Sequence, residues 1–238
     1  MQLFYLADLS DSTFEFTEDE SKHCIRVLRK KKGDELTLID GKGTEAKGII
    51  EQDNPKKCSG IIVAKTHHQR NKNYTLHLAI APTKNFDRIE WMLEKIIEIG
   101  VDEISFIETN TSERGKINSE RCNKIAVSAM KQSKQYYLPK INGITSLKNF
   151  LKGCETTSSK FIAYCPTPVT QTLFNQIPLP MPSHSILLIG PEGDFTQQEV
   201  EEAISLGFKP VSLGSNILRS ETAGLVGVTS FANKAQTT

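Results

Sequence analysis

The sequence of 238 residues has few cysteines and no apolar run long enough to cross a membrane. Its five cysteines are odd in number and never stand in C-x-x-C spacing, which indicates neither a disulfide framework nor a zinc site. The adjacent His67 and His68 would point to opposite faces of a strand and have no third ligand nearby. The N-terminus carries Asp8 and Asp11 in place of a basic region followed by an apolar stretch. We therefore expect a cytoplasmic protein with no signal peptide, no membrane association and no bound metal.

The sequence also lacks an excess of charge of one sign, because 29 Lys and Arg balance 28 Asp and Glu. A total of +1 argues neither for nor against a polyanionic partner, so the distribution of the charges matters more. Residues 22–32 contain six basic side chains and no acid, and residues 114–140 contain seven against one glutamate. Residues 192–202 carry five acids and no base. A basic run is either a solvated face or a contact to nucleic acid, and the charge pattern alone does not decide between them.

The composition, with 38% hydrophobic and 24% charged residues, is typical of a globular protein with one large or two small domains. A polar stretch at residues 69–73 marks a boundary. Before it, residues 36–39 lead into a hairpin signal at residues 40–43, and residues 60–66 have the pattern of another strand. We therefore predict a mostly β first domain, residues 1–70, followed by a second domain at residues 74–238.

Strand and helix patterns alternate from residue 74 onward. Strands are expected at residues 74–81, 104–107 and 161–164, and helices at residues 86–99 and 119–135. The alternation indicates a parallel α/β sheet. One stripe of the second helix would carry four basic residues, Arg121, Lys124, Lys131 and Lys134.

The C-terminal part contains a glycine loop directly after a strand-like run. Residues 186–189 are short and continuously apolar, as a strand buried on both faces would be, and the sequence Gly-Pro-Glu-Gly interrupts them at residues 190–193. Thr196 and Glu199 form a capping box for the helix that follows, which Gly207 ends.

A second loop repeats this arrangement. Residues 210–213 have a strand pattern, residues 214–222 form a loop that contains Arg219 and Glu221, and small and apolar residues at 223–232 predict a last helix. Open α/β sheets bind ligands at the carboxyl ends of their strands, where helix N-termini and free backbone N–H groups converge. Two loops at the ends of neighbouring strands therefore predict a cofactor pocket, and the alternative is a pair of ordinary connections.

Four separated segments carry a resemblance to a known family. GPEGDF at residues 190–195 and LGSNILRSETA at residues 213–223 resemble the signature of the SPOUT superfamily, and within it of the RsmE family of 16S ribosomal RNA uridine-N3 methyltransferases. HCIRVLR at residues 23–29 and EKIIEIGV at residues 94–101 resemble two further elements of that family. Three positions depart from the usual pattern: Asp194 stands where a second glycine is common, Ser220 where threonine is usual, and Gly224 where alanine or threonine is expected.

The resemblance implies a fold that the periodicity would not predict. Chains do not ordinarily knot, yet SPOUT proteins tie their C-terminal segment into a deep trefoil knot. The expected architecture is therefore α/β, with a SPOUT methyltransferase domain of parallel sheet and trefoil knot at residues 74–238 and a small PUA-like RNA-binding β-barrel at residues 1–70. A Rossmann methyltransferase would instead place its glycine loop after its first strand.

The resemblance also implies a reaction, a cofactor and partners. The expected activity is S-adenosylmethionine-dependent methylation of uracil N3 in 16S rRNA, acting on the RNA or the small ribosomal subunit as a homodimer. Part of the dimer contact is expected on the last helix, where Ala223, Gly224, Gly227 and Ser230 would allow close approach unless they serve packing within the monomer. Two alternatives remain, a non-catalytic rRNA-binding assembly factor and a related ribose 2'-O-methyltransferase.

The expected site residues fall into three groups. Cofactor binding is assigned to Leu188, Ile189, Gly190, Glu192, Gly193, Leu213, Gly214, Ile217 and Leu218. RNA binding is assigned to Arg26, Arg29, Lys31, Arg121, Lys124, Lys131 and Lys134. Arg219 would stabilise the negative charge on the base with its rigid fork of donors, unless it pairs with Glu221 or Glu192 and holds the loop closed. Glu221 would act as general base or, next to a helix start, as a cap.

Overall fold

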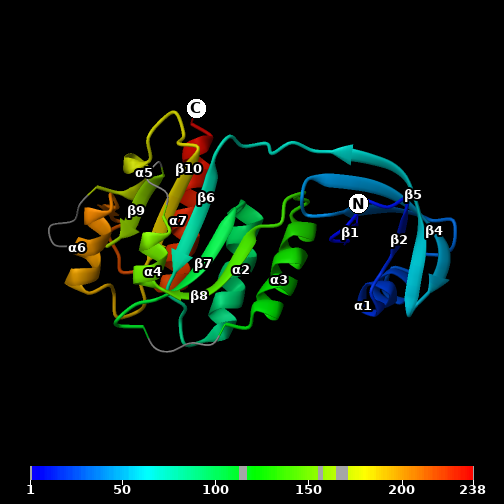
Figure 1. The fold of residues 1–238 in the computed structure, drawn as a ribbon, viewed down its shortest axis with the longest axis horizontal. Helices are drawn as coiled ribbons and strands as arrows, with labels where there is room; N and C mark the ends of the chain where they lie inside the picture. The colour runs from blue at the N-terminus through cyan, green and yellow to red at the C-terminus, as the bar shows by residue number, and fades with distance from the viewer. Residues whose placement is uncertain (1, 113–116, 155–157, 165–170, 238) are drawn as a thin grey trace. The chain divides into compact units, whose positions relative to one another are not determined.

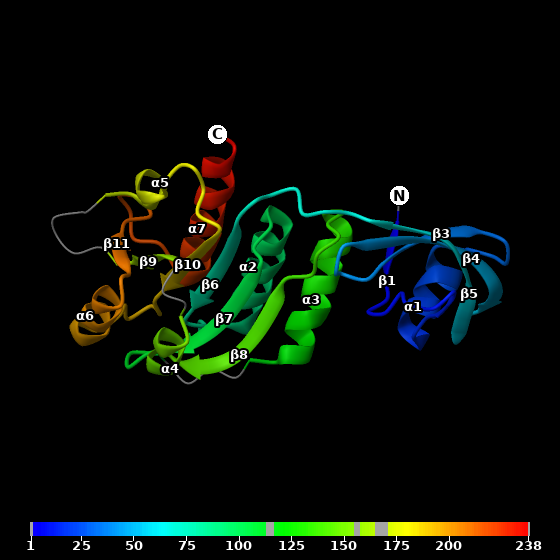
Figure 2. The ribbon, with the colours of Figure 1, turned by 45° about the horizontal axis from the view of Figure 1, so that its top comes forward.

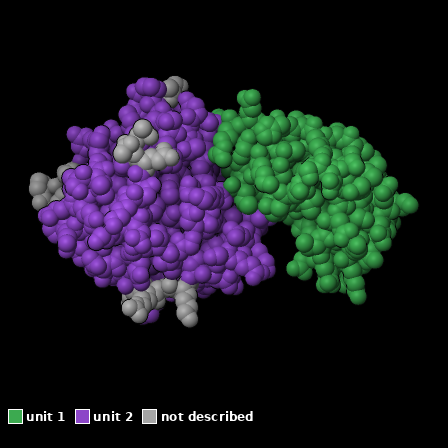
Figure 3. All heavy atoms as spheres, viewed as in Figure 1, with its two compact units in different colours: residues 1–71, 130–138 green, residues 72–129, 139–238 purple. Residues whose placement is uncertain are grey.

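The computed structural model describes residues 2–112, 117–154, 158–164 and 171–237. The chain forms two compact units (Figure 3). Unit 1 contains residues 1–71 and 130–138, and unit 2 contains residues 72–129 and 139–238. Residues 130–138 belong to unit 1 because Met130 packs in a cluster with Leu3 and Ile39. No local sequence pattern predicts this return of the chain.

Unit 1 is built on a five-stranded sheet in the order β1-β3-β4-β5-β2. Its elements are β1 (Leu3–Tyr5), β2 (Thr13–Glu15), α1 (Glu18–Lys22), the π-helical turn η1 (His23–Val27), β3 (Glu35–Ile39), β4 (Thr44–Asn54) and β5 (Lys57–His67). The expected hairpin is confirmed, since β3 and β4 pair antiparallel. Asp40 Oδ1 closes its turn by accepting hydrogen bonds from the backbone N–H groups of Lys42, at 2.7 Å, and Thr44, at 2.9 Å.

Unit 2 contains a six-stranded parallel sheet in the order β11-β9-β10-β6-β7-β8 (Figure 1). Its strands are β6 (Thr75–Ile80), β7 (Glu103–Glu108), β8 (Lys140–Ser146), β9 (Ser159–Ala163), β10 (His184–Ile189) and β11 (Lys209–Val211). Its helices are α2 (Phe86–Ile99), α3 (Ser119–Gln132), α4 (Leu147–Lys152), α5 (Leu173–Gln176), α6 (Gln197–Ser205) and α7 (Ser220–Ala235). The predicted parallel α/β sheet is therefore confirmed. Within the described ranges, no helix is long and apolar enough to span a membrane.

Local signals define the ends of the main helices. Asn85 caps α2 by accepting a hydrogen bond from Asp87 N at 2.9 Å, and Gly100 ends it in the left-handed conformation with φ 106°. The predicted capping box of Thr196 and Glu199 at the start of α6 is present. These signals set where each helix starts relative to the strand before it.

The sheet of unit 2 is covered on both faces, as Figures 1 and 2 show. On one face, α4 and α6 pack through side chains such as Leu151 and Val200. On the other, α7 lies against β6, β10 and α2, and it can do so because two of its residues lack a side chain. A Cβ at Gly224 would lie 2.9 Å from Met92 Sδ, and one at Gly227 would collide with Leu187 Cδ2. These two glycines therefore serve packing within the monomer. The dimer contact expected on the last helix stays a prediction.

Several sequence expectations need correction. Helix α3 ends at Gln132, so Lys134, which has φ 57°, does not continue the basic stripe. The second strand before the loops is β11, which ends at Val211, because Ser212 bonds instead to Gln171 and Leu173. The last helix begins at Ser220, three residues before the expected start. Strand β8 and the short helices α4 and α5 were not predicted, because their sequences show little apolar periodicity.

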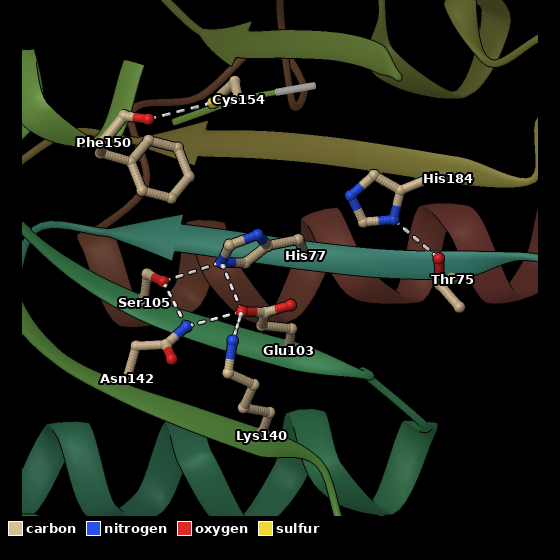
Figure 4. Close-up of polar contacts among 9 residues, drawn as sticks. All are labelled: Thr75, His77, Glu103, Ser105, Lys140, Asn142, Phe150, Cys154 and His184. Atoms are coloured by element: carbon tan, nitrogen blue, oxygen red, sulfur yellow. Dashed lines mark hydrogen bonds and ion pairs between the residues drawn. The ribbon is translucent and has the colours of Figure 1, made fainter. Parts of the chain in front are cut away.

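A polar cluster interrupts the face of the sheet that α4 covers (Figure 4). His77 Nε2 lies 2.8 Å from Ser105 Oγ and 4.0 Å from Glu103 Oε1. Asn142 Nδ2 donates to Ser105 Oγ at 2.9 Å and to Glu103 Oε1 at 2.7 Å, and Lys140 Nζ donates to the same carboxylate oxygen at 2.9 Å. Burial lowers the pKa of His77 to about 4, although the charge of Glu103 acts in the opposite direction.

This low pKa predicts a pH-dependent stability. Between the ordinary value of 6.5 and the folded value of about 4, the unfolded chain binds a proton at His77 that the folded protein does not bind. The free energy of unfolding should therefore fall as the pH falls through this window, by on the order of 3 kcal/mol at full effect. Urea unfolding between these pH values should show a flatter profile for His77→Gln than for the wild type. The exposed control His67→Gln should follow the wild type, and an equal slope in all three proteins would contradict the assignment.

Candidate active site

Two loops leave the parallel strands β10 and β11 at the same edge of the sheet. The expectation that these two strands are neighbours is wrong, because β9 lies between them and pairs with both. The loops meet nevertheless, since Ser220 Oγ, at the end of the second loop, donates a hydrogen bond to Gly190 O of the first at 2.9 Å. The two predicted loops are thus joined at the carboxyl edge of the sheet by this hydrogen bond from the first residue of α7.

The first loop, residues 190–195, is held by the segment that follows β7. Thr111 Oγ1 donates a hydrogen bond to Asp194 O, and a Cβ at Gly193 would lie 3.3 Å from Thr111 Cβ. Asp194 has φ 59°, which accounts for the glycine that is common at this position, and burial raises the pKa of its carboxyl. At Gly190, an added Cβ would lie 3.0 Å from the Phe195 ring. Gly190 and Gly193 therefore allow the Phe195 ring and Thr111 to pack directly against the loop backbone.

The second loop, residues 212–219, is more open. Ser212 Oγ donates to Gly214 O at 2.7 Å and accepts from Gly214 N at 3.1 Å, which folds the loop back on itself at its start. Gly214 has φ 143°. Ile217 is fully exposed at 103%, whereas Leu213 and Leu218 are half-buried. This loop therefore has one apolar side chain, Ile217, that nothing in the described part of the chain covers, and two leucines that are partly covered.

A third segment, the first turn of α2, joins the two loops through Arg88. Arg88 Nη1 lies 3.6 Å from Glu192 Oε1, and Arg88 Nε lies 3.7 Å from Glu221 Oε1. The Glu192 side chain is 63% exposed, but that of Glu221 is only 8% exposed. Arg88 therefore bridges an exposed carboxylate of the first loop and a buried carboxylate in the first turn of α7.

The Glu221 carboxylate is incompletely satisfied. Its Oε2 is buried and has no hydrogen-bond partner among the described residues. A buried oxygen of this kind costs about 1–3 kcal/mol when it stays unpaired, more for a charged group. The helix N-terminus of α7 offsets part of that cost, but Arg219 and not Glu221 occupies the N-cap position. The site therefore contains a buried acceptor that no donor of the described residues satisfies.

Arg219 lies apart from the carboxylates. Its side chain is exposed and makes no ion pair or hydrogen bond with the residues that the structure describes. The alternative role of Arg219, pairing with Glu221 or Glu192, falls to Arg88 instead. The two residues expected to do chemistry thus lie close together in the chain but differ in exposure, since Arg219 is exposed and Glu221 is buried.

Two of the expected cofactor residues belong to the sheet. Leu188 and Ile189 are buried at 0% and 2% exposure, and both pair with β6 and β9. The carbonyl of Ile189 accepts a hydrogen bond from Ala81 N at 3.0 Å. Their backbone groups are therefore used by the sheet, and the open part of the first loop begins at Gly190.

Some of the basic residues form ion pairs with glutamates and others do not. Arg26, Arg29 and Lys31 are exposed in unit 1, and no hydrogen bond or ion pair joins their side chains to the described residues. Lys131 instead forms an ion pair with Glu20 at 2.6 Å. In unit 2, Lys124 pairs with Glu120 at 2.8 Å and Arg121 donates to Glu90 at 2.7 Å. The basic residues of 114–140 at Arg114 and Lys116 lie outside the described residues.

Arg88 and Thr111 were missed by the sequence analysis. Arg88 is the detectable one, because a cation in the first turn of a helix is unfavourable next to the positive end of the helix dipole. An arginine there indicates a carboxylate partner that compensates. Thr111 gave no such signal. Among the residues that can be described, no three His, Cys, Asp or Glu side chains are placed to hold a metal ion.

Comparison with known families places the chain in one of them. Residues 70–232 match the family described as an RNA methyltransferase domain, and residues 16–63 match an RNA methyltransferase PUA domain. Two proteins named ribosomal RNA small subunit methyltransferase E are similar over most of the chain. The one from Bacillus subtilis is 27% identical and covers 94% of this chain and 91% of its own length. The one from Mesomycoplasma hyopneumoniae is 34% identical over 72% of this chain and 74% of its own.

Solved structures give the same result. A probable rRNA methyltransferase from Porphyromonas gingivalis has a TM-score of 0.93 and 39% identity, with 100% of this chain and 99% of that chain covered. A ribosomal RNA small subunit methyltransferase E from Neisseria gonorrhoeae, solved bound to S-adenosylmethionine, has a TM-score of 0.84 and 26% identity, with 98% and 97% covered. Sequence and structure together show that this chain belongs to the RNA methyltransferase family of the ribosomal RNA small subunit methyltransferase E proteins.

Proposed function

We propose that this protein methylates N3 of a specific uridine in 16S rRNA with S-adenosylmethionine as methyl donor. The relatives carry the name of a small-subunit rRNA methyltransferase, and one neighbour was solved with S-adenosylmethionine bound. The observation that carries the proposal is the unpartnered buried oxygen of Glu221, two residues along the chain from the exposed Arg219, at the point where the two glycine loops meet.

The two loops fit S-adenosylmethionine. We propose that backbone groups of the two loops and the side chains at their edges hold it, through Gly190, Glu192, Gly193, Leu213, Gly214, Ile217 and Leu218. The exposed Ile217 and half-buried Leu218 offer apolar cover for an adenine ring. When bound, S-adenosylmethionine supplies a methyl group on a positive sulfonium. The carboxylates of Glu192 and Glu221 make the site favourable for that charge.

The reaction requires a proton acceptor and a stabiliser of negative charge. Uracil N3 carries a proton at neutral pH and must lose it as its nitrogen forms the new bond to the methyl carbon. The electron pair of the breaking carbon–sulfur bond stays on sulfur. In our proposal Glu221 accepts the N3 proton, and the guanidinium of Arg219 stabilises the anionic base through its planar donors.

The substrate nucleotide must be accessible at its pairing edge. N3 of uracil is engaged in a base pair within a duplex, so an unpaired or extruded uridine avoids a cost of a few kcal/mol. We propose that Arg26, Arg29, Lys31 and Lys134, whose charges are not neutralised by ion pairs with described residues, contact the RNA phosphates from unit 1. Arg121, Lys124 and Lys131 already pair with glutamates, and they would have to exchange these partners for phosphates.

Two finer features of the fold are also proposed. A trefoil knot in unit 2 is supported by the path of the C-terminus, because α7 follows the edge strand β11 yet packs against the central strands β6 and β10. A closed β-barrel in unit 1 is supported by its edge strands. Phe4 of β1 stacks on Phe16 at 5.2 Å, and Phe14 of β2 lies 5.1 Å from the same ring, so both edges contribute to one core.

A homodimer forms a further part of the proposal, because isologous two-fold pairs are the commonest oligomers. Because Gly224 and Gly227 pack against Met92 and Leu187 of the same chain, we look for the dimer contact at other residues. Trp91 of α2 is 45% exposed and lies on the helix that packs against α7. We propose this exposed aromatic side chain as the centre of the dimer contact.

The function is tested by mapping the methylated nucleoside. Purified protein, labelled S-adenosylmethionine and 16S rRNA or small subunits from cells lacking the enzyme should give one N3-methyluridine, which mass spectrometry of nuclease digests identifies. Transfer to a ribose 2'-oxygen would favour the alternative methyltransferase. Tight RNA binding without any transfer would favour a non-catalytic assembly factor.

Arg219 should affect the rate more than cofactor binding. Loss of one preorganised donor that stabilises developing charge lowers the rate by about 10² to 10³, so Arg219→Ala should reduce single-turnover methylation on this scale. Arg219→Lys should restore little, because an ammonium group lacks the planar fork. Calorimetry should find nearly unchanged affinity for S-adenosylmethionine. Equal losses in affinity and rate would show that Arg219 holds the loop and does not act on the base.

The exposed basic residues of unit 1 should set the salt dependence of RNA binding. Removing one cation that neutralises a phosphate lowers the log–log slope of affinity against salt by about 0.7 to 0.9. The triple variant Arg26→Glu, Arg29→Glu and Lys31→Glu should therefore bind rRNA more weakly and with a flatter slope. A triple charge reversal at Lys47, Lys56 and Lys57 matches the change in net charge on the same unit. If both triple variants lowered the salt slope of RNA affinity equally, the change would be due to net charge alone and not to these three residues.

A further inference from the structure

A hollow of about 670 Å³ opens in unit 2 on the face of the sheet that α4 covers. On β6, β7 and β10 its lining residues, such as His77, Glu103 and His184, stand in the first half of the strand, and on β8 the lining extends from Lys140 to Thr145. The two glycine loops follow the opposite ends of the strands. Its volume is in the range of small-molecule sites, about 300–1,000 Å³, and nothing in the proposed methyl transfer uses it.

The hydrogen-bond network supports a donor on the ring nitrogen of His77 that is not bonded to Ser105. Asn142 Nδ2 donates to Ser105 Oγ, so the single hydroxyl hydrogen of Ser105 is free to be donated to His77 Nε2, 2.8 Å away. When His77 Nε2 accepts that hydrogen, the imidazole, kept neutral by the low pKa that burial gives it, carries its own hydrogen on Nδ1. No residue in the described ranges accepts that hydrogen. His77 therefore presents a donor to the hollow.

The same reasoning assigns an acceptor to His184. When Thr75 Oγ1 donates its hydrogen to Ser183 O, at 3.1 Å, it accepts from His184 Nδ1, 2.7 Å away. In the neutral ring Nε2 is then without a hydrogen. Figure 4 shows this nitrogen turned away from Thr75 toward the space above His77, where Phe150 also lies. The hollow therefore has one donor and one acceptor that face a common space.

The other residues that line the hollow are suited to contact a flat aromatic ring. The Phe150 ring meets the His77 ring edge-on, with centroids 5.2 Å apart and an interplanar angle of 73°. Ile186 adds an apolar side chain. Cys154 Sγ donates to Phe150 O at 3.3 Å, and because burial raises the pKa of this thiol it keeps the hydrogen it donates. Phe150 is thus held in place on one side of the donor–acceptor pair.

The charges argue against other ligands. Glu103 accepts from Lys140 and Asn142 inside the hollow, and its negative charge disfavours a simple anion. A metal ion lacks a third ligand among the described residues. Lys140 is 69% exposed at the rim, where its ammonium is accessible to a phosphate group.

We propose that this hollow binds a nucleobase, which accepts a hydrogen bond from His77 Nδ1, donates one to His184 Nε2 and lies against the Phe150 ring. Neighbouring acceptor and donor groups on one edge are the property that the nucleobases share. The base comes either from a free nucleotide or from single-stranded RNA, in which case Lys140 contacts the attached phosphate. The site is separate from the cofactor loops, and it does not depend on methyl transfer.

Two substitutions remove the hydrogen bonds to the ligand and keep the internal ones. In His77→Gln, the amide oxygen takes the place of Nε2 and still accepts from Ser105, but the donor at Nδ1 is absent. In His184→Asn, the amide nitrogen takes the place of Nδ1 and still donates to Thr75, but the acceptor at Nε2 is absent. The exposed His67→Gln serves as the control, because His67 lies in unit 1 outside the hollow.

Nuclear magnetic resonance of protein labelled with ¹⁵N at histidine tests the proposal. The four nucleoside monophosphates and a single-stranded hexanucleotide are added separately, with an abasic hexanucleotide as the phosphate-only probe. At least one probe with bases should shift the ring nitrogens of His77 and His184, and each variant should weaken its binding about tenfold, the scale of removing one hydrogen bond. A response to the monophosphates identifies a free nucleotide, and a response to the hexanucleotide alone identifies RNA.

Three results would overturn the proposal. These are no shift of either ring with any probe, an equal response to the abasic strand, or variants that bind as the wild type does. Affinity for S-adenosylmethionine should be the same in all variants. A failure of the proposed methyl transfer would leave these histidine shifts unchanged, so the two proposals are judged separately.

Discussion

The ion pair between Arg88 and the buried Glu221 is the interaction on which the site depends. Removing a carboxylate from water costs several kcal/mol after relaxation, and a partner at 3.7 Å together with the positive end of a helix offsets that cost. Arg88 also reaches Glu192, so one guanidinium connects α2, the first loop and the start of α7. The pair leaves one carboxylate oxygen without a donor among the described residues, and in our proposal a ligand supplies that donor.

The position of Glu221 requires the C-terminal helix to pass close under the sheet. Gly224 and Gly227 allow this approach, because a Cβ at either position would meet Met92 or Leu187. Alanine or threonine at Gly224, which the family resemblance leads one to expect, would need Met92 to move. The same helix start supplies Ser220, whose hydroxyl bonds to Gly190 O. The packing of α7 against the sheet therefore also sets the positions of the two loops. A larger residue at Gly224 or Gly227 would shift α7 and with it Ser220 and Glu221.

The sequence was informative where the signal is local. The capping box of Thr196 and Glu199, the hairpin after β3 and the end of α2 at Gly100 are confirmed, because each depends on neighbouring residues. The order of the strands is set by contacts distant in the chain, so the insertion of β9 between β10 and β11 was not predicted. Arg88 was missed although its place in the first turn of α2 is a local signal, because its carboxylate partners, Glu192 and Glu221, are distant in the chain. The polar cluster around His77 has no sequence signature, since its members come from β6, β7 and β8.

The central claim is that the Arg88–Glu221 pair serves a ligand as well as the fold, and a double-mutant cycle measures this most directly. Arg88→Met should destabilise the protein by about 3–5 kcal/mol, because it leaves a buried carboxylate without its partner. Adding Glu221→Gln should recover most of that loss. Affinity for S-adenosylmethionine, measured by calorimetry on the same proteins with the exposed Lys124→Ala as control, should stay low in the double variant. Recovery of both stability and affinity would contradict the account, because the pair would then be purely structural.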